Sequence, residues 1–325
     1  MPRNRRTDGF TLIELSIVLV IIGLIVGAVL VGQDLIRAAE IRAQISQIEK
    51  YQTAVNTFRL KFGYLPGDIP DPTASSFGFA ARGTFKGEGD GNGLIQHHNY
   101  DPRFNGTTNG YNVATGENAL FWRDLSQAGL IDGSFTAAAA DTLPGSDITD
   151  KSQISGYFPQ ARLGNGNNIY VWSGGGSDNG ENNEPGDGFN YFGISAITQI
   201  GDIEFGPGGY VYSSPGLSVQ SAYNIDQKID DGLPQSGTVT AIFSDCAVPW
   251  AGCIAWAAGG SNHYAGDTPT YGADSGAPDY GPTTAATAPA SNTCYDNGNI
   301  GGAAQHYSLA QNGSAINCAL SFRFQ

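Results

Sequence analysis

One carboxylate stands inside the most apolar stretch of the chain. Phe10–Val31 reads FTLIELSIVLVIIGLIVGAVLV, 22 residues in which Glu14 is the only ionisable side chain. A charge at mid-bilayer costs about 2.5–3.5 kcal/mol on insertion scales, and less near the interface. A carboxylate kept at such a cost is more often functional than accidental, so Glu14 is a candidate functional residue.

A second set of candidate ligands lies in segment 88–95, which reads EGDGNGLI. Acidic and amide oxygens that alternate with glycines suit a tight loop around calcium, with Asp90, Asn92 and Glu88 as the donors. The segment resembles the start of a D-x-[DN]-x-[DN]-G calcium loop, but Leu94 takes the third ligand position and no glutamate follows at the expected distance. Two interpretations stay open, a bound calcium ion and a plain glycine turn.

The chain has four cysteines, Cys246, Cys253, Cys294 and Cys318. In an exported domain they predict two disulfide bonds, for which three pairings exist. We favour Cys246–Cys253 and Cys294–Cys318, because sequence neighbours close small loops and the second bond would hold the C-terminal strand. Their spacings fit no CxxC zinc pattern.

No arrangement of residues predicts catalysis. The histidines are His97, His98, His263 and His306, and no G-x-S-x-G elbow or cysteine-nucleophile context accompanies them. Neither a GxGxxG nor a P-loop string is present. The sequence therefore predicts no enzyme and no catalytic residue.

Charge divides the chain into a rod and a head. From Gln33 to Lys61 there are five basic and three acidic residues, whereas the residues after Lys61 hold 8 basic and 25 acidic ones, a net charge of −17. An acidic head excludes nucleic acid as a predicted partner, because phosphate binding requires a basic face.

The apolar stretch predicts a membrane-spanning helix that continues beyond the membrane. As a helix, Phe10–Val31 would be about 33 Å long, and the basic leader 1–9 before it would stay in the cytoplasm. Apolar positions then recur on one helical face to residue 62, where Gly63 and Pro66 end the pattern. They are Ile41, Ile45, Ile48, Val55, Phe58 and Phe62. A secretory signal, an ordinary single-pass anchor and a helix broken at Gly23, Gly27 or Gly32 are the alternatives.

The string GFTLIEL at residues 9–15 resembles the processing site of type IV pilins and type II secretion pseudopilins. The resemblance is specific over residues 9–31 and extends to about residue 68, where KFGYLPGD is similar to the helix exit of many such proteins. It implies cleavage by a prepilin peptidase between Gly9 and Phe10 and N-methylation of Phe10. It also implies that Glu14 neutralises the N-terminus of a neighbouring subunit during assembly. Similar DG-rich loops occur in pilin relatives that bind calcium.

The head, residues 63–325, is expected to be rich in strands and loops. Helices are predicted at 118–129 and 221–229, with Leu120, Phe121, Leu125 and Leu130 as core contacts. Strands are predicted at 168–173, 191–197, 209–213, 238–243 and, half-buried, at 319–324. The run 224–232, NIDQKIDDG, is similar to a string of the same group, and we interpret Asp230 and Asp231 first as turn formers and second as cation ligands. Segment 177–187 is expected to be a solvated loop, and about 257–292 a mobile insertion.

Together these features predict an α+β, pilin-like fold with a long N-terminal helical spine, and no certain cofactor beyond the possible Ca²⁺. The expected function is that of a structural subunit of a type IV pilus or secretion pseudopilus, more in keeping with a minor or large subunit. The alternative is a surface adhesin or substrate-recognition module on a pilin stalk. Expected partners are prepilin peptidase, other pilin or pseudopilin subunits and the inner-membrane assembly platform. The chain would sit in the inner membrane before assembly, and afterwards in a periplasmic or cell-surface filament.

Overall fold

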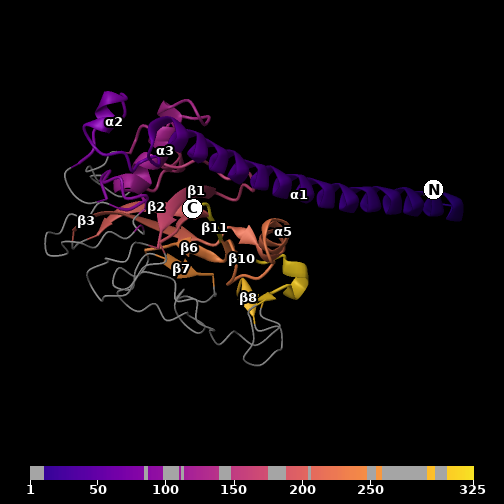
Figure 1. Cartoon of the computed structure of the whole chain (residues 1–325). Helices are drawn as coiled ribbons and strands as arrows, with labels where there is room; N and C mark the ends of the chain where they lie inside the picture. Colours follow the sequence, from indigo (N-terminus) through magenta and orange to yellow (C-terminus); the bar gives the residue numbers. More distant parts are fainter. Residues whose placement is uncertain are drawn as a thin grey trace, which may run out of the picture.

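A computed structural model describes residues 11–83, 87–97, 110, 113–138, 148–174, 188–203, 206–246, 254–257, 291–296 and 306–325. One long helix carries a mixed head along its second half (Figure 1). The first half of that helix projects away from the head as a bare rod (Figure 1).

Helix α1 (Leu12–Phe62) is continuous over 51 residues, about 76 Å at 1.5 Å per residue. It begins at the N-cap Thr11 and ends at Gly63, whose φ of 83° places it in the left-handed region that favours glycine. The Gly63 N–H donates to the carbonyl of Arg59 at 2.8 Å. The predicted helix and its glycine stop are confirmed, and the three glycines inside it do not interrupt it.

The second half of α1 contributes one face to the core. Ile41, Ile48, Val55 and Phe58 are almost completely buried, as the apolar periodicity predicts. Two members of the predicted stripe, Ile45 and Phe62, are only partly buried but still pack against the core.

Aromatic rings connect α1 to the rest of the head. Tyr51 of α1 packs edge-on against Trp122, with ring centroids 4.9 Å apart, and both rings contact Phe192. Phe192 in turn stacks on Phe324 at 4.2 Å. Buried aromatic pairs of this kind add about 0.5–1.5 kcal/mol each beyond their area. These ring contacts pack the head against the second half of α1.

The main sheet has five antiparallel strands in the order β1-β2-β11-β5, with β3 paired to the second half of β2. Its members are β1 (Asn167–Ser173), β2 (Asn190–Ile203), β3 (Gly206–Ser214), β5 (Val239–Thr240) and β11 (Leu320–Arg323).

Shorter elements surround this sheet. Three two-stranded sheets pair β10 with β4, β6 with β7, and β8 with β9. The strands concerned are β4 (Leu217–Ser218), β6 (Ile242–Ser244), β7 (Ile254–Trp256), β8 (Tyr295–Asp296), β9 (His306–Tyr307) and β10 (Ile316–Cys318). The helices are α2 (Thr73–Ser76), α3 (Gly116–Gln127), α4 (Lys151–Ile154), α5 (Val219–Ile229) and the 3-10 turn η2 (Ala310–Gly313).

The terminal strand differs from the prediction. Alternation in 319–324 predicted a half-buried strand, but β11 lies between β2 and β5, and Leu320, Ser321 and Phe322 are all buried. The polar member of the alternation is satisfied inside the core, because the Trp172 Nε1–H donates to Ser321 Oγ at 2.9 Å. The predicted strand 238–243 is divided in two, β5 and β6, around Ala241.

The predicted helices 118–129 and 221–229 correspond to α3 and α5. Leu120, Phe121 and Leu125 are fully buried, and Leu130 packs partly buried against the core, so their prediction as core contacts is confirmed. The predicted loop 177–187 and most of the predicted insertion 257–292 lie outside the described residues.

Candidate functional site

The N-terminal end of α1 is organised by one carboxylate. Glu14 Oε2 accepts hydrogen bonds from the backbone N–H and the hydroxyl of Thr11, each at 2.8 Å, while the Thr11 hydroxyl accepts from the Glu14 N–H at 3.3 Å. This reciprocal capping box satisfies two of the backbone donors that a helix start leaves open. Glu14 Oε1 has no partner among the described residues, so one oxygen stays available to a cation.

Residues 1–10 lie outside the described residues, and with them Gly9 and Phe10. The contact that the resemblance assigns to Glu14, with the N-terminus of another subunit, therefore stays a prediction. The structure adds that Thr11, three residues before Glu14, orients this carboxylate.

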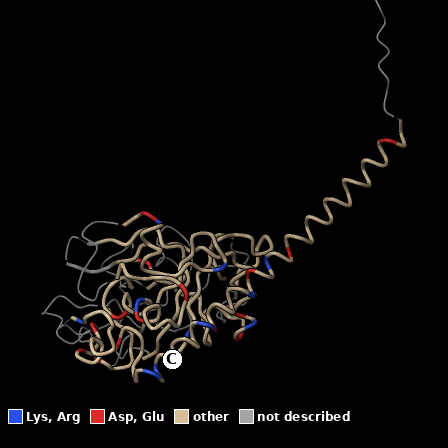
Figure 2. Tube along the Cα trace, turned by 90° about the horizontal axis from the view of Figure 1, so that it is seen from above, with Lys and Arg blue, Asp and Glu red and all other residues tan. Residues whose placement is uncertain are grey.

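The first half of α1 is apolar on every side and covered by nothing. Leu12 is 87% exposed and Leu24 is 71% exposed. The most apolar 18-residue window has a mean hydropathy of 3.0 and none of it is buried, so this helix is long and apolar enough to cross a membrane. In Figure 2 the projecting rod carries one acidic position near its start and then none until it approaches the head. The acidic position is Glu14.

At the glycine loop, residues 88–95, three carboxylates from separate parts of the chain lie close together. Oxygens of Asp68, Asp90 and Glu117 lie within 4.8 Å of one another. Asp68 follows the end of α1 in the LPGD string, and Glu117 lies in the first turn of α3. Two oxygens on opposite sides of a calcium ion, each at 2.3–2.6 Å, would be separated by about 4.6–5.2 Å. The spacing therefore fits a shared cation.

These carboxylates also shape the loop. Asp68 accepts from the N–H groups of Gly91 and Gly93 at 2.8 and 3.0 Å. Glu117 Oε1 accepts from the N–H groups of Gly89 and Asp90, at 2.9 and 3.2 Å. Gly89, Gly91 and Gly93 all have positive φ, so the loop requires glycine at each of these positions.

Burial makes the charged forms of Asp68 and Glu117 unfavourable. It raises the pKa of Asp68 to about 7, with the neighbouring charge of Asp90 adding to the effect. It also raises the pKa of the fully buried Glu117 well above its ordinary value, and the charges of Asp68 and Asp90 contribute further. Protonation or a cation would relieve this repulsion.

Of the three predicted calcium donors, the structure brings only Asp90 into this carboxylate group. The Asn92 side chain lies beside it and donates from Nδ2 to Asp90 Oδ2 at 3.0 Å and to Gln96 Oε1 at 2.7 Å. Glu88 is buried against Gly83, so close that a Cβ on that glycine would overlap its carboxylate. Sequence inspection missed Asp68 and Glu117, because a loop motif contains no signal for residues outside the loop. Calcium binding stays a prediction.

A second group of carboxylates lies at the C-terminal end of α5. Asp226, Asp230 and Asp231 also lie within 4.8 Å of one another. Asp230 accepts from the N–H groups of Thr238 and Val239, and Asp231 from the Leu233 N–H at 2.8 Å. These bonds confirm the turn-forming role, while the cation role stays open.

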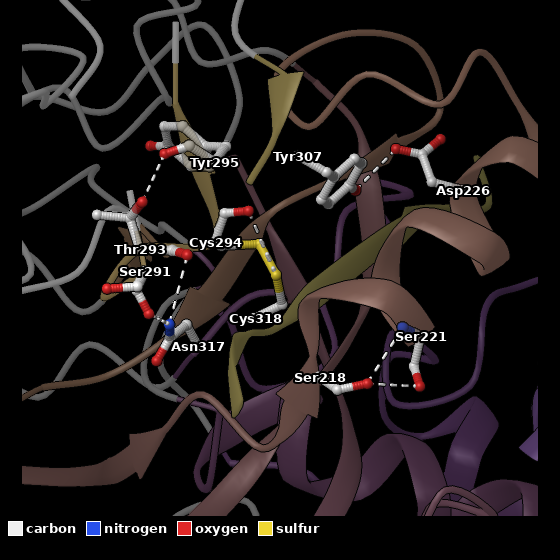
Figure 3. The surroundings of a disulfide bond; sticks show 10 residues. All are labelled: Ser218, Ser221, Asp226, Ser291, Thr293, Cys294, Tyr295, Tyr307, Asn317 and Cys318. Atoms are coloured by element: carbon white, nitrogen blue, oxygen red, sulfur yellow. Dashed lines mark hydrogen bonds between the residues drawn. A yellow bond between two sulfur atoms is a disulfide. The ribbon is translucent and has the colours of Figure 1, made fainter. Parts of the chain in front are cut away.

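The predicted Cys294–Cys318 disulfide is present (Figure 3). Beside it, Asn317 Nδ2 donates to the carbonyl of Ser291 at 3.0 Å, and the Tyr307 hydroxyl donates to the buried Asp226 at 2.8 Å (Figure 3). The disulfide joins Cys294, directly before β8, to Cys318 at the end of β10, and so ties the chain before β8 to the segment that leads into β11. Cys253 lies outside the described residues, so Cys246–Cys253 stays a prediction.

One comparison bears on the first of these sites. Residues 4–30 match the family model described as the prokaryotic N-terminal methylation motif, which covers most of the leader, the Thr11–Glu14 cap and most of the bare apolar stretch. No curated protein and no solved structure was found to match the chain. The match confirms the resemblance of the GFTLIEL string. The chain therefore carries the prepilin-type cleavage and methylation signature of type IV pilins and pseudopilins.

Proposed function

We propose that this chain is a structural, non-enzymatic subunit of a type IV pilus or a type II secretion pseudopilus. The observation that carries the proposal is the prepilin-type motif, residues 4–30, which runs into the start of a continuous helix whose apolar first half is uncovered. Prepilin peptidase would cut between Gly9 and Phe10, the new N-terminus would be methylated, and α1 would move from the inner membrane into a filament on the assembly platform.

Solvation supports this sequence of events. Burying one aliphatic side chain contributes about 1.5–3 kcal/mol, so the exposed stretch from Leu12 to Ile36 gains on the order of tens of kcal/mol by leaving water. A membrane supplies such a setting before assembly, and a bundle of similar helices supplies it afterwards. Removal of the leader takes away Arg3, Arg5 and Arg6, which would otherwise hold the N-terminus at the cytoplasmic surface.

Glu14 would serve as the device that sets the register of the bundle. The α-amino group created by cleavage is a cation in an apolar environment, and Glu14 Oε1 is an acceptor without a partner among the described residues. An unpaired buried charge is strongly destabilising, so only axial positions that bring these two groups together are stable. The size of the head, residues 63–325, favours a minor or large subunit.

Mass spectrometry of the mature protein tests the processing step. We expect a chain that begins with N-methylated Phe10, and we expect Gly9→Val to leave the full leader because a branched side chain would crowd the scissile bond. Asp8→Asn, one position earlier, is the matched control and should be processed normally. A wild-type protein that keeps Met1 would refute the proposal.

Incorporation into sheared filaments tests Glu14. Glutamine can also occupy the third position of a capping box, so Glu14→Gln keeps the helix cap and removes only the charge. We expect both Glu14→Gln and Glu14→Ala to be cleaved normally but poorly incorporated. If Glu14→Gln assembles like the wild type, capping is the function of Glu14 and the register role is wrong.

A further inference from the structure

Two long runs of the head carry no charged side chain. After Lys61 the chain has 8 basic and 25 acidic residues, about one charge in every eight positions. Residues 205–225 and 297–322 nevertheless include no Asp, Glu, Lys or Arg. Such runs are unusual in a head whose net charge is −17, so where they lie in the fold matters.

Parts of the two runs lie side by side. Strand β4 pairs antiparallel with β10, and the N–H of Val219, the first residue of α5, donates to the carbonyl of Ala315 at 3.0 Å. Turn η2 packs so closely on the start of α5 that a Cβ on Gly313 would lie 2.8 Å from the backbone nitrogen of Gln220. Residues 217–224 and 309–317 therefore form one surface, which we call the uncharged face.

The uncharged face presents apolar side chains to solvent. Ile316 is 54% exposed and Leu309 is 43% exposed. Between them, the exposed Gln311 and Asn312 have φ of 52° and 58°, in the left-handed region that L side chains rarely adopt. A conformation of this kind is kept at a cost and is a reason to look for a function. Apolar side chains beside uncharged polar ones suit the boundary between lipid headgroups and hydrocarbon.

The position of this face relative to the membrane follows from α1. In Figure 1, α5 and the yellow turn η2 lie at the end of the head from which the bare half of α1 projects. Ile41 is the first residue of α1 that the head buries, and the exposed Ile36 lies about 7.5 Å before it. The headgroup layer on each side of a bilayer is about 5–7.5 Å thick. When the apolar half of α1 spans the membrane, the head therefore begins where the headgroup layer ends.

We propose that the uncharged face rests on the headgroup layer of the membrane in which α1 is anchored, an inference that rests on the membrane-stored stage of the proposed function. Two observations select lipid as the occupant. The continuous helix α1 holds this end of the head at the height of the lipid surface. The acidic remainder of the head is repelled by anionic lipid, whereas a face without charge can approach the membrane closely.

The contact would orient the stored subunit. A single membrane-spanning helix leaves the head free to rotate about the helix axis. Insertion of Leu309 and Ile316 among the headgroups removes apolar surface from water and selects the rotation in which the uncharged face points to the lipid. Entry into a filament would break this contact.

Photolabelling of the full chain in phosphatidylcholine vesicles tests the contact. The probe is phosphatidylcholine with a diazirine near its headgroup, which on illumination reacts with whatever touches it, and peptide mass spectrometry locates the label. We expect label in residues 306–318 and none at Phe77, which is 50% exposed but follows α2 at the opposite end of the head (Figure 1). The same lipid with the diazirine in the middle of an acyl chain should label residues 12–31 and so verify that α1 spans the membrane.

Replacement of the apolar side chains tests what holds the face on the lipid. Leu309→Asp and Ile316→Asp should each weaken the contact about 3- to 10-fold, because each side chain has about half of its surface free to leave water. Phe77→Asp is the matched control and should leave the label in residues 306–318 unchanged. Leu309 lies outside the strands, so Leu309→Asp alone keeps the test valid if Ile316→Asp disturbs β10. An unchanged melting temperature verifies that each variant is folded.

Label in α1 without label in residues 306–318 of the wild type would overturn this inference and leave the proposed function intact. Undiminished label in the folded aspartate variants would overturn it too, because the apolar side chains would then not hold the face on the lipid. If residues 306–318 are protected from the lipid probe and from a water-soluble diazirine alike, protein covers the face and the assignment to lipid is wrong. Absence of label in α1 would instead refute the membrane stage of the proposed function.

Discussion

Replacing Asp90 by asparagine separates the two interpretations of the glycine loop. Asp90 is the exposed member of the group that it forms with Asp68 and Glu117. The asparagine would keep one side-chain oxygen for the Asn92 N–H, which Asp90 now accepts at 3.1 Å, so the loop should fold. The change removes one charge from the group and one ligand from a bound calcium ion.

The magnitude follows from Asp68. Burial raises its pKa from 3.8 to about 7, so between these pH values the folded state without a cation binds more protons than the unfolded state. Stability then falls as the pH rises through this window, by about 1.36 kcal/mol for each pH unit, or on the order of 4 kcal/mol in total. A calcium ion removes this loss because it favours the charged carboxylates. For a domain of this size, about 4 kcal/mol corresponds to a melting-temperature difference of about 8–16 °C.

Thermal unfolding of the full chain in detergent, followed by tryptophan fluorescence, measures this effect. Trp122 is fully buried against Tyr51 and should report loss of the core. We expect a chelator to lower the wild-type melting temperature at a pH of about 7.5 and to have little effect near pH 4, where Asp68 is protonated in the folded protein. Asp90→Asn should lose the calcium response and, with chelator present, should melt above the wild type at pH 7.5.

Asp34→Asn on the exposed part of α1 is the matched control and should respond to calcium like the wild type. Equal melting temperatures of the wild type with calcium and with chelator at both pH values would refute the cation site. A full calcium response in Asp90→Asn would show that the ion binds elsewhere.

Three further substitutions test how the head is held together. Cys318→Ser should destabilise the protein by about 3 kcal/mol, because it opens the loop of 24 residues closed by the disulfide, and denaturant unfolding under oxidising conditions measures this loss. Arg82→Met should lower the free energy of unfolding by about 3–5 kcal/mol, because it leaves the buried Asp124 carboxylate without its cation. If the unpaired carboxylate is the cause, the double variant with Asp124→Leu should recover most of that loss. Gly63→Ala should lower the melting temperature by a few degrees, because alanine costs about 1 kcal/mol in the left-handed region at φ 83°, while Gly32→Ala in the middle of α1 should not lower it.

Local signals explain what the sequence predicts well. Helix α1 could be predicted because its two signals are local. The apolar spacing lies within the helix, and the glycine stop, Gly63, directly follows it. The same holds for the Cys294–Cys318 pair, which closes a short segment.

The remaining features depend on contacts between distant residues. Ser321 reads as a solvent-facing residue in an alternating strand, yet β11 enters the middle of the sheet and meets Trp172, 149 positions earlier. The group of Asp68, Asp90 and Glu117 is a similar case, since Asp68 lies 22 positions before Asp90 and Glu117 lies 27 positions after it. Chain topology, which no local pattern contains, brings these residues together.

A cation bound by Asp68, Asp90 and Glu117 would also affect the proposed assembly, because of where this group lies. Asp68 follows the end of α1, Glu117 lies in the first turn of α3, and Trp122 of α3 packs against Tyr51 of α1. A cation shared by Asp68 and Glu117 would therefore close a ring of contacts around the junction between rod and head. Without the cation, repulsion between the two carboxylates would loosen this junction and leave the N-terminal end of α1 unchanged. We therefore expect Asp90→Asn to be cleaved at the normal rate while its incorporation becomes insensitive to calcium, measured as the ratio of sheared to membrane-bound protein in calcium-depleted and calcium-supplemented cultures. If incorporation depends on calcium equally in the variant and the wild type, the group of Asp68, Asp90 and Glu117 does not control how the head packs on α1.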